Sequence, residues 1–226
     1  MSASEALNIL SNVPYFSEIA EEDLENIAKQ ALPKEYGPDQ VVFQEGDRSA
    51  GLFVVESGWF KVIKISPGGR EQVINFIGPG EAFNALSLFA DIPNPATAIA
   101  LESAKLWLIR HEVMLQMIDA YPNLAQAVIK TLAGRVLHLV ALVEDLSLRS
   151  VESRLARLLL EQAADETVHR QKWATQTELA ARLGTVTDVL SRALRKLSDD
   201  GLISVSRHQI QVLKPAELEA RANSGQ

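Results

Sequence analysis

Short hydrophobic runs separated by glycine-containing turns dominate residues 33–110. Five runs rich in Val, Ile, Leu and Phe lie at 41–43, 52–55, 60–65, 73–77 and 106–109. The turns between them combine glycine with proline, serine or acidic residues, at 45–47, 57–58, 67–69 and 78–80. Apolar runs of this length bounded by turn residues are typical of β-strands. Several such strands at short spacing predict one antiparallel β-roll or barrel.

Helical patterns flank these strands, a broken one at 4–31 and a long one at 122–148. Pro122 suits the first turn of a helix, where its missing N–H is not needed. Apolar residues then recur at three- and four-residue steps: Leu124, Val128, Leu132, Val136, Leu139, Val143 and Leu146. This heptad-like seam predicts a parallel dimerisation helix with Leu132, Val136, Leu139, Val143 and Leu146 at the interface. Because the flanks are also apolar, one side should pack on the β domain; a single core helix within one subunit is the alternative.

The composition is that of a globular protein with room for two small domains: 226 residues, 47% hydrophobic and 23% charged. The chain has no cysteine, which excludes disulfides, thiolate metal sites and cysteine-ligated iron–sulfur clusters. The N-terminal residues do not resemble a signal peptide, and no apolar stretch approaches the ~20 residues of a membrane span. We therefore expect a cytoplasmic protein with no membrane partner.

The net charge of −7 is unevenly distributed along the chain. Residues 1–147 hold 10 basic and 19 acidic side chains, whereas residues 148–226 hold 12 basic and 10 acidic ones. Only the C-terminal part is therefore suited electrostatically to face phosphate groups.

Residues 175–213 contain the most informative pattern in the chain. Thr175 is followed three residues later by Glu178, a capping box that begins a helix, and Gly184 suits the end of that helix. Thr187 is expected to cap a second helix whose inward face is Leu190, Ala193, Leu194 and Leu197. The runs 201–206 and 210–213 add a two-stranded wing with its turn at 207–209, and 219–226 are expected to fray. Two helices joined by a tight turn and followed by a wing predict a winged helix-turn-helix.

The second helix of this pattern has side chains suited to reading DNA. The base-reading candidates lie on the face away from Leu190 and Leu194: Thr187, Asp188, Ser191 and Arg192. Arginine pairs with guanine and an acidic side chain accepts from cytosine, which are contacts made in the major groove. The phosphate-contacting candidates are Thr175, Gln176, Arg195, Lys196 and Arg207. A small helical hairpin with a solvated charged face is the alternative.

Nearly the whole chain resembles the cyclic AMP receptor protein and fumarate–nitrate regulator (Crp/Fnr) family of bacterial transcription regulators. The resemblance lies in the spacing of the glycines in the roll, the segment 82–89, the long helix and the Thr-x-x-Glu-Leu-Ala…Leu-Ser-Arg-x-Leu segment. It implies an α+β fold with a sensory β-roll at 1–121, a dimerisation helix at 122–148 and a winged helix-turn-helix at 149–226. It also implies a homodimer that binds double-stranded DNA and acts with RNA polymerase.

The recognition segment 188–192 is similar to the Glu-x-x-Ser-Arg pattern of the fumarate–nitrate branch, with Asp188 in place of glutamate. The resemblance implies a palindromic site with TTGA-like half-sites and a contact from Arg192 to the half-site guanine. It does not indicate whether transcription is activated or repressed.

The predicted effector pocket departs from that of the cyclic-nucleotide members. Asn84 and Ala85 replace their Gly-Glu pair, 95–97 replace their Arg-Ser pair, and Leu139 and Val140 replace a polar pair on the long helix. Cyclic AMP is therefore not expected to bind, and the lack of cysteine excludes the iron–sulfur cluster of other members. The pocket would be formed by Phe83, Asn84, Ala85, Leu86, Leu88, Thr97, Leu139 and Val140.

The segment 89–94 is similar in sequence to members of the nitric-oxide-responsive branch, which regulates dissimilatory nitrate respiration. Members of that branch are associated with haem. His138, or His111, would then be the candidate axial ligand. DNA binding without any effector remains equally open.

Two other classes of function fit the sequence less well. A cupin-like enzyme would need two or three histidines and a carboxylate on its strands, and residues 33–110 contain no histidine. A nucleotide-binding module that regulates a partner protein would not need the basic recognition helix. We expect no catalytic residues and no protein-ligated metal.

Overall fold

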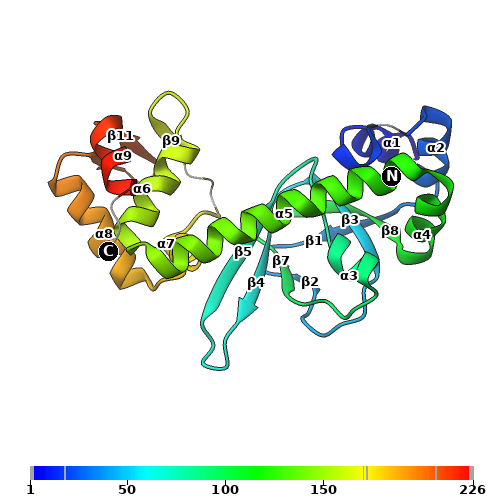
Figure 1. Ribbon diagram of the computed structural model, residues 1–226, viewed down its shortest axis with the longest axis horizontal. Helices are drawn as coiled ribbons and strands as arrows, with labels where there is room; N and C mark the ends of the chain where they lie inside the picture. Colours follow the sequence, from blue (N-terminus) through cyan, green and yellow to red (C-terminus); the bar gives the residue numbers. More distant parts are fainter. Residues whose placement is uncertain (1–2, 18, 170, 172, 207, 224–226) are drawn as a thin grey trace. The chain divides into compact units, whose positions relative to one another are not determined.

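The computed structural model describes residues 3–17, 19–169, 171, 173–206 and 208–223 (Figure 1). The chain divides into two compact units, residues 1–64 with 74–138 and residues 65–73 with 139–226. The α+β fold expected from the sequence is confirmed, with strands in the N-terminal part, one long helix and a small C-terminal domain.

The N-terminal unit is built around two sheets of a β-roll. One sheet has the order β1 (Leu32–Tyr36), β8 (Ala104–Arg110), β3 (Gly51–Ser57) and β6 (Ala82–Phe83). The other has the order β2 (Val41–Phe43), β7 (Thr97–Ala100), β4 (Phe60–Ile65) and β5 (Glu71–Ile77). All five predicted runs are strands. The sequence did not predict β1, β6 and β7, because β1 is largely polar, β6 has two residues and β7 is rich in alanine, a weak strand former.

Stacked phenylalanines fill the space between the two sheets. The ring centroid of Phe53 lies 5.2 Å from that of Phe83 and 5.6 Å from that of Phe43, and Phe60 lies 5.8 Å from Phe83. Offset aromatic contacts at these distances are favourable beyond their burial alone. The interior of the roll is therefore closely packed around Phe83.

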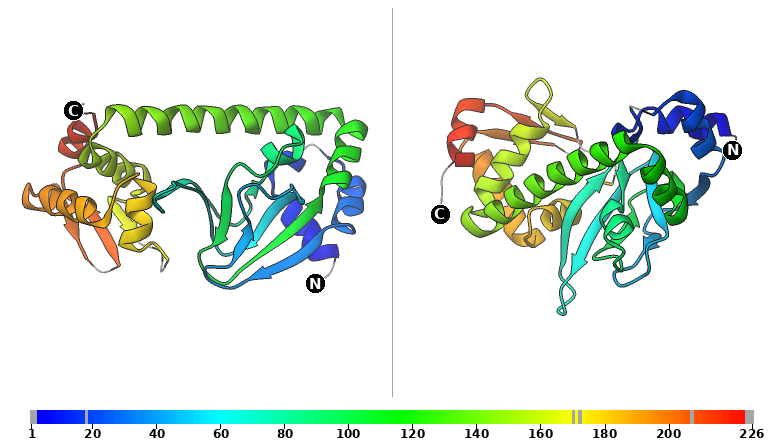
Figure 2. Two further views of the ribbon diagram at one scale, coloured as in Figure 1. Left: turned by 90° about the horizontal axis from the view of Figure 1, so that it is seen from below. Right: turned by 45° about the vertical axis from the view of Figure 1, so that its right-hand side comes forward.

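A second core lies between the helices and the outer face of the β3–β8 sheet. It joins α1 (Ala3–Leu10), the turn of 3₁₀-helix at Pro14–Phe16, α2 (Glu21–Ala28), α3 (Ala85–Ala90) and α4 (His111–Ala120). The start of α5, which lies beside α4 (Figures 1 and 2), also belongs to this core, because Leu124 and Val128 are buried there. This core fixes which side of α5 faces the roll.

The long helix α5 spans Pro122–Leu148, the bounds predicted from the sequence. Leu132 packs against the roll core, and Arg135 donates to the carbonyl of Ala82 at 3.3 Å. Beyond this point most of its apolar side chains are exposed. By length and composition α5 could cross a membrane, contrary to the sequence expectation. Its first turns, however, are buried in the core of the β-roll unit.

The C-terminal unit has a helical core beside a small antiparallel sheet. Its helices are α6 (Val151–Gln162), α7 (Gln176–Arg182), α8 (Thr187–Asp199) and α9 (Pro215–Asn223). The sheet has the order β10 (Ile203–Val205), β11 (Gln209–Val212) and β9 (Thr167–His169). The predicted two-stranded wing thus gains β9 as a third strand. The sequence did not predict β9, because Val168 is its only strongly apolar residue.

The expectation that residues 219–226 fray is wrong for the described part of that segment. Helix α9 continues to Asn223, and Leu218 and Ala222 are buried against α6. Ser153 Oγ and Arg149 Nη1 each donate to the carbonyl of Ala222 at 2.6 Å. These donors satisfy the end of the helix, which the local sequence does not show.

Replacing Leu218 with alanine should therefore destabilise the C-terminal domain. Its side chain is 0% exposed, and truncating a buried leucine leaves a cavity that costs about 2–4 kcal/mol. Urea unfolding followed by circular dichroism would measure this, with Glu219→Ala on the exposed side of α9 as the matched control. An unchanged unfolding midpoint for Leu218→Ala would show that α9 contributes nothing to the core.

Candidate nucleic-acid interface

Helix α7 and the turn after it follow from the local sequence. The Thr175 hydroxyl accepts a hydrogen bond from the backbone N–H of Glu178 at 3.2 Å, so the predicted cap is confirmed. After Arg182 the chain passes through Gly184 at φ +62°, a conformation that glycine adopts without steric cost. The Thr185 N–H then donates to the Ala180 carbonyl at 2.9 Å. This closes a tight turn between the two helices.

Helix α8 presents one buried and one exposed face. Leu190, Ala193, Leu194 and Leu197 are buried in the domain core, as predicted. One detail was wrong, because the N-cap residue is Val186 rather than Thr187, and no side chain caps the helix. Thr187 is the first residue of the helix. Its hydroxyl is therefore not the capping group that the sequence indicated.

The four base-reading candidates lie along the face of α8 that points away from the core. Asp188 and Arg192 are exposed, and Thr187 and Ser191 are partly exposed. Ser191 Oγ lies 3.4 Å from Gln176 Oε1, which links the start of α7 to the middle of α8. Among the described residues, Arg192 forms no ion pair. Its guanidinium is therefore available for a partner outside the chain.

The phosphate candidates divide into three groups. Thr175, Gln176 and Arg195 are exposed beside this face, and Arg195 has no ion-pair partner in the described part of the chain. Lys196 instead pairs with Glu152 of α6 at 2.6 Å, and Arg221 of α9 pairs with the same carboxylate. Arg207 lies outside the described residues. Of the two neighbouring cations in α8, Arg195 is thus better placed than Lys196 to contact a phosphate.

Arg154 holds the C-terminal end of α7 in place, through a contact that the sequence does not indicate. Its Nη1 donates to the carbonyl of Leu183, the residue that follows α7. Burial lowers the pKa of Arg154 and also that of Arg182, and both remain charged because the normal value for arginine is so high. A cation at the C-terminal end of a helix is favourable. No local signal relates residue 154 to residue 183.

Comparisons with known proteins agree with this arrangement. Models of the cyclic nucleotide-binding domain and of the Crp-like helix-turn-helix domain match residues 33–121 and 153–221. The cyclic AMP receptor protein of Thermus thermophilus is 27% identical over 206 residues, which cover 91% of this chain and 95% of that one. The transcriptional activator protein anr of Pseudomonas aeruginosa is 24% identical, covering 89% and 84%.

The chain is a regulator of the Crp/Fnr family. A crystal structure from Eubacterium rectale, assigned to the same family, has the same fold. It aligns with a TM-score of 0.75 at 21% identity and covers 95% of this chain and 100% of the other. The relatives of this Crp/Fnr regulator are regulators of transcription rather than enzymes, as the sequence predicted.

The residues predicted for the effector pocket belong to different layers of this Crp/Fnr regulator. Phe83 lies in the aromatic interior of the roll, whereas Ala85 and Leu88 are buried in the helical core on the other side of the sheet. Leu86 is 52% exposed. Leu139 and Val140 are exposed on α5. This separation arises because successive side chains point to opposite faces of a strand and around the axis of a helix, so that neighbours in sequence enter different layers.

The polar members of that set have structural partners. Asn84 adopts φ +73° directly before α3, and its Nδ2 donates to Ser49 Oγ and to the Gly51 carbonyl, each at 3.1 Å. Asparagine tolerates this backbone conformation better than most residues, which is why it can stand where the cyclic-nucleotide members carry glycine. Thr97 Oγ1 accepts from the Glu45 N–H at 3.0 Å.

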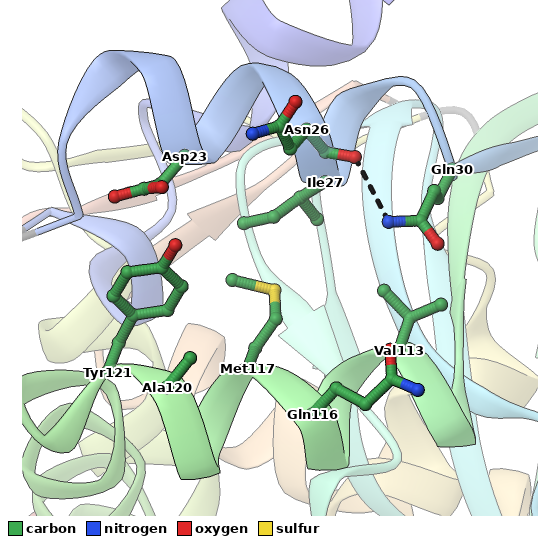
Figure 3. A pocket seen from close by; sticks show the side chains of 9 residues that line it. All are labelled: Asp23, Asn26, Ile27, Gln30, Val113, Gln116, Met117, Ala120 and Tyr121. Atoms are coloured by element: carbon green, nitrogen blue, oxygen red, sulfur yellow. Dashed lines mark hydrogen bonds between the residues drawn. The ribbon is translucent and has the colours of Figure 1, made fainter.

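A small pocket lies between α2 and α4, away from the roll interior (Figure 3). Its volume is about 110 Å³, whereas pockets for small ligands usually measure roughly 300–1,000 Å³. Asp23 and Tyr121 stand at one end, and their hydrogen bond raises the pKa of the Tyr121 hydroxyl. This pocket has room for water molecules but not for a nucleotide or a porphyrin.

Proposed function

We propose that this Crp/Fnr regulator is a homodimer that binds a palindromic DNA site with TTGA-like half-sites through α8. The observation that carries the proposal is the exposed guanidinium of Arg192, which forms no ion pair within the described ranges, with Asp188 and Ser191 on the same face. An arginine at this place can donate two hydrogen bonds to guanine, and the carboxylate can accept from the paired cytosine. The proposal extends to action with RNA polymerase in the cytoplasm.

The exposed face of α5 supports the dimer. Ile129, Val136, Val140 and Val143 are exposed and follow one another at seven-, four- and three-residue steps, which is the spacing of a coiled-coil seam. The exposed side chains support a seam that is shifted from the predicted one. Leu132 packs on the roll, while Val136, Leu139, Val143 and Leu146 remain exposed and Ile129 and Val140 join them.

The residues present do not fit haem. His138 is exposed, and its Nε2 lies 3.3 Å from the carbonyl of Ile74. His111 lines a surface hollow of about 420 Å³ with Arg48 and Asp91, outside the phenylalanine-filled interior of the roll. The nitric-oxide-responsive branch thus stays a prediction. Cyclic AMP is also not proposed, because Pro95, Ala96 and Thr97 fill the window in which the cyclic-nucleotide members carry arginine and serine.

The buried side-chain amide of Asn94 favours a second candidate function, in which a small polar effector regulates DNA binding. DNA binding without an effector is the alternative. Asn94 is 2% exposed, and neither its Oδ1 nor its Nδ2 has a hydrogen-bond partner among the described residues. A buried amide without partners is unfavourable, so an ordered water molecule or a small hydrogen-bonding ligand would stabilise it.

Fluorescence anisotropy at fixed near-physiological salt tests the proposed function. The full chain is titrated onto a labelled TTGA-type palindrome and onto a scrambled duplex, alone, with haem and with cyclic AMP. We expect the palindrome to bind at least about 10³-fold more tightly than the scrambled duplex, equally in all three conditions. Equal affinity for both duplexes would contradict the half-site, and a gain of specificity only with haem would contradict the fit argued above.

A further inference from the structure

The recognition helix begins differently from its two neighbours in the C-terminal domain. Helix α6 is capped by Ser150, whose hydroxyl accepts from the Ser153 N–H at 3.2 Å, and α7 is capped by Thr175. The N-cap of α8 is Val186, at φ −112° and ψ 158°, with no side-chain hydrogen bond. Serine, threonine, asparagine and aspartate are strongly preferred at such a position, and valine is among the poorest choices.

Val186 is also poorly placed for burial. Its side chain is 51% exposed, so it contributes little to the domain core, to which Leu190 is the first residue of α8 to belong. Val189, one turn along, is only partly buried as well. The residue therefore favours neither the start of the helix nor the packing of the domain. Val186 lies at the N-terminal tip of α8, and this end of a recognition helix enters the major groove.

We propose that Val186 is a specificity residue that contacts the C5-methyl group of a half-site thymine. The inference rests on the proposed function and deepens it. Arg192 and Asp188 supply hydrogen bonds that suit a G·C pair, but neither recognises the methyl group that distinguishes thymine in the major groove. An apolar side chain does so. A TTGA-like half-site is thus read by polar groups at its guanine and by Val186 at a thymine.

Replacing thymine by deoxyuridine removes this methyl group and leaves base pairing unchanged. For the wild-type chain, deoxyuridine at the contacted thymine should weaken binding about fourfold per half-site, the change for removing one buried methyl group. Each thymine of the palindrome is replaced in turn. In Val186→Ala the same replacement should cost less than about twofold, because the methyl group has already lost its partner.

Val186→Ser gives a second measurement with the opposite sign. A serine supplies the missing cap, so the thermal unfolding midpoint should rise by roughly 2–6 °C while discrimination between thymine and deoxyuridine is lost. A residue with a merely structural role would not move the two readouts in opposite directions. Leu213→Ser is the matched control, because Leu213 is comparably exposed in the same domain outside α8, and it should leave the deoxyuridine effect unchanged.

Two results would overturn the inference while leaving the proposed function intact. One is a wild-type chain that prefers the palindrome over the scrambled duplex but is indifferent to deoxyuridine at every thymine. The other is an equal deoxyuridine penalty in wild type and Val186→Ala. A wild-type chain without preference for the palindrome would instead overturn the proposed half-site, and this inference with it.

Discussion

Arg192→Ala should weaken binding to the TTGA-type palindrome by about 1–3 kcal/mol per half-site, or roughly 5- to 150-fold. The reason is that Arg192 is exposed on α8 and pairs with no described acidic group, so its guanidinium reaches DNA without breaking another interaction. A bidentate contact to guanine is lost when the side chain is truncated. Anisotropy titrations of the wild-type chain and of Arg192→Ala on the palindrome and on the scrambled duplex measure this loss of affinity.

Arg195→Ala is the matched control for this prediction. Arg195 is equally free of ion pairs among the described residues and lies one turn further along α8, where a phosphate contact is expected. Its removal should weaken binding to both duplexes alike and lower the salt dependence of log K by about one unit per half-site. If Arg192→Ala lowered the affinity for both duplexes equally, Arg192 would be a phosphate contact and not a base reader.

Val140→Asp together with Val143→Asp should convert the homodimer into a monomer. Both side chains are about two-thirds exposed in the single chain, 60% and 64%, so the substitutions should have little effect on the stability of the folded subunit. In the proposed dimer they are buried in the seam, where an unpaired carboxylate is strongly unfavourable. Sedimentation velocity at micromolar concentration would show the change in mass. Affinity for the palindrome should fall by about 10²-fold or more, because each subunit then binds its half-site alone.

Val41→Asp provides the control for the added charge. Val41 is also an exposed valine, but it lies on β2 at the edge of the roll, so this variant should stay dimeric. A dimer that survives the double substitution on α5 would place the interface on another surface. Unchanged circular dichroism in all variants confirms that the subunit fold is retained.

The helix-turn-helix could be predicted from the sequence because its signals are local. Thr175 caps the residue three positions ahead, Gly184 supplies the turn conformation, and the spacing of Leu190, Leu194 and Leu197 defines a helical face. Each signal acts within about one helical turn. The five apolar strands and the bounds of α5 were predictable for the same reason. Together they indicated the fold and the DNA-binding class of function.

The effector pocket could not be predicted in this way. Phe83, Ala85 and Leu86 are close in sequence, yet they lie in the roll interior, in the helical core and at the surface. A resemblance transfers positions along a chain. Whether those positions still surround a cavity depends on side chains from other strands, here Phe43, Phe53 and Phe60.

The sequence by itself determined most of the helices and strands, and which face of α8 is buried and which is exposed, because periodicity and capping depend on neighbouring residues. Only the tertiary structure decided which side of α5 stays exposed, that Lys196 is held by Glu152, and that the last helix packs on α6. These features depend on contacts between residues far apart in the chain. Such contacts are determined by packing and charge in three dimensions and leave no local pattern in the sequence.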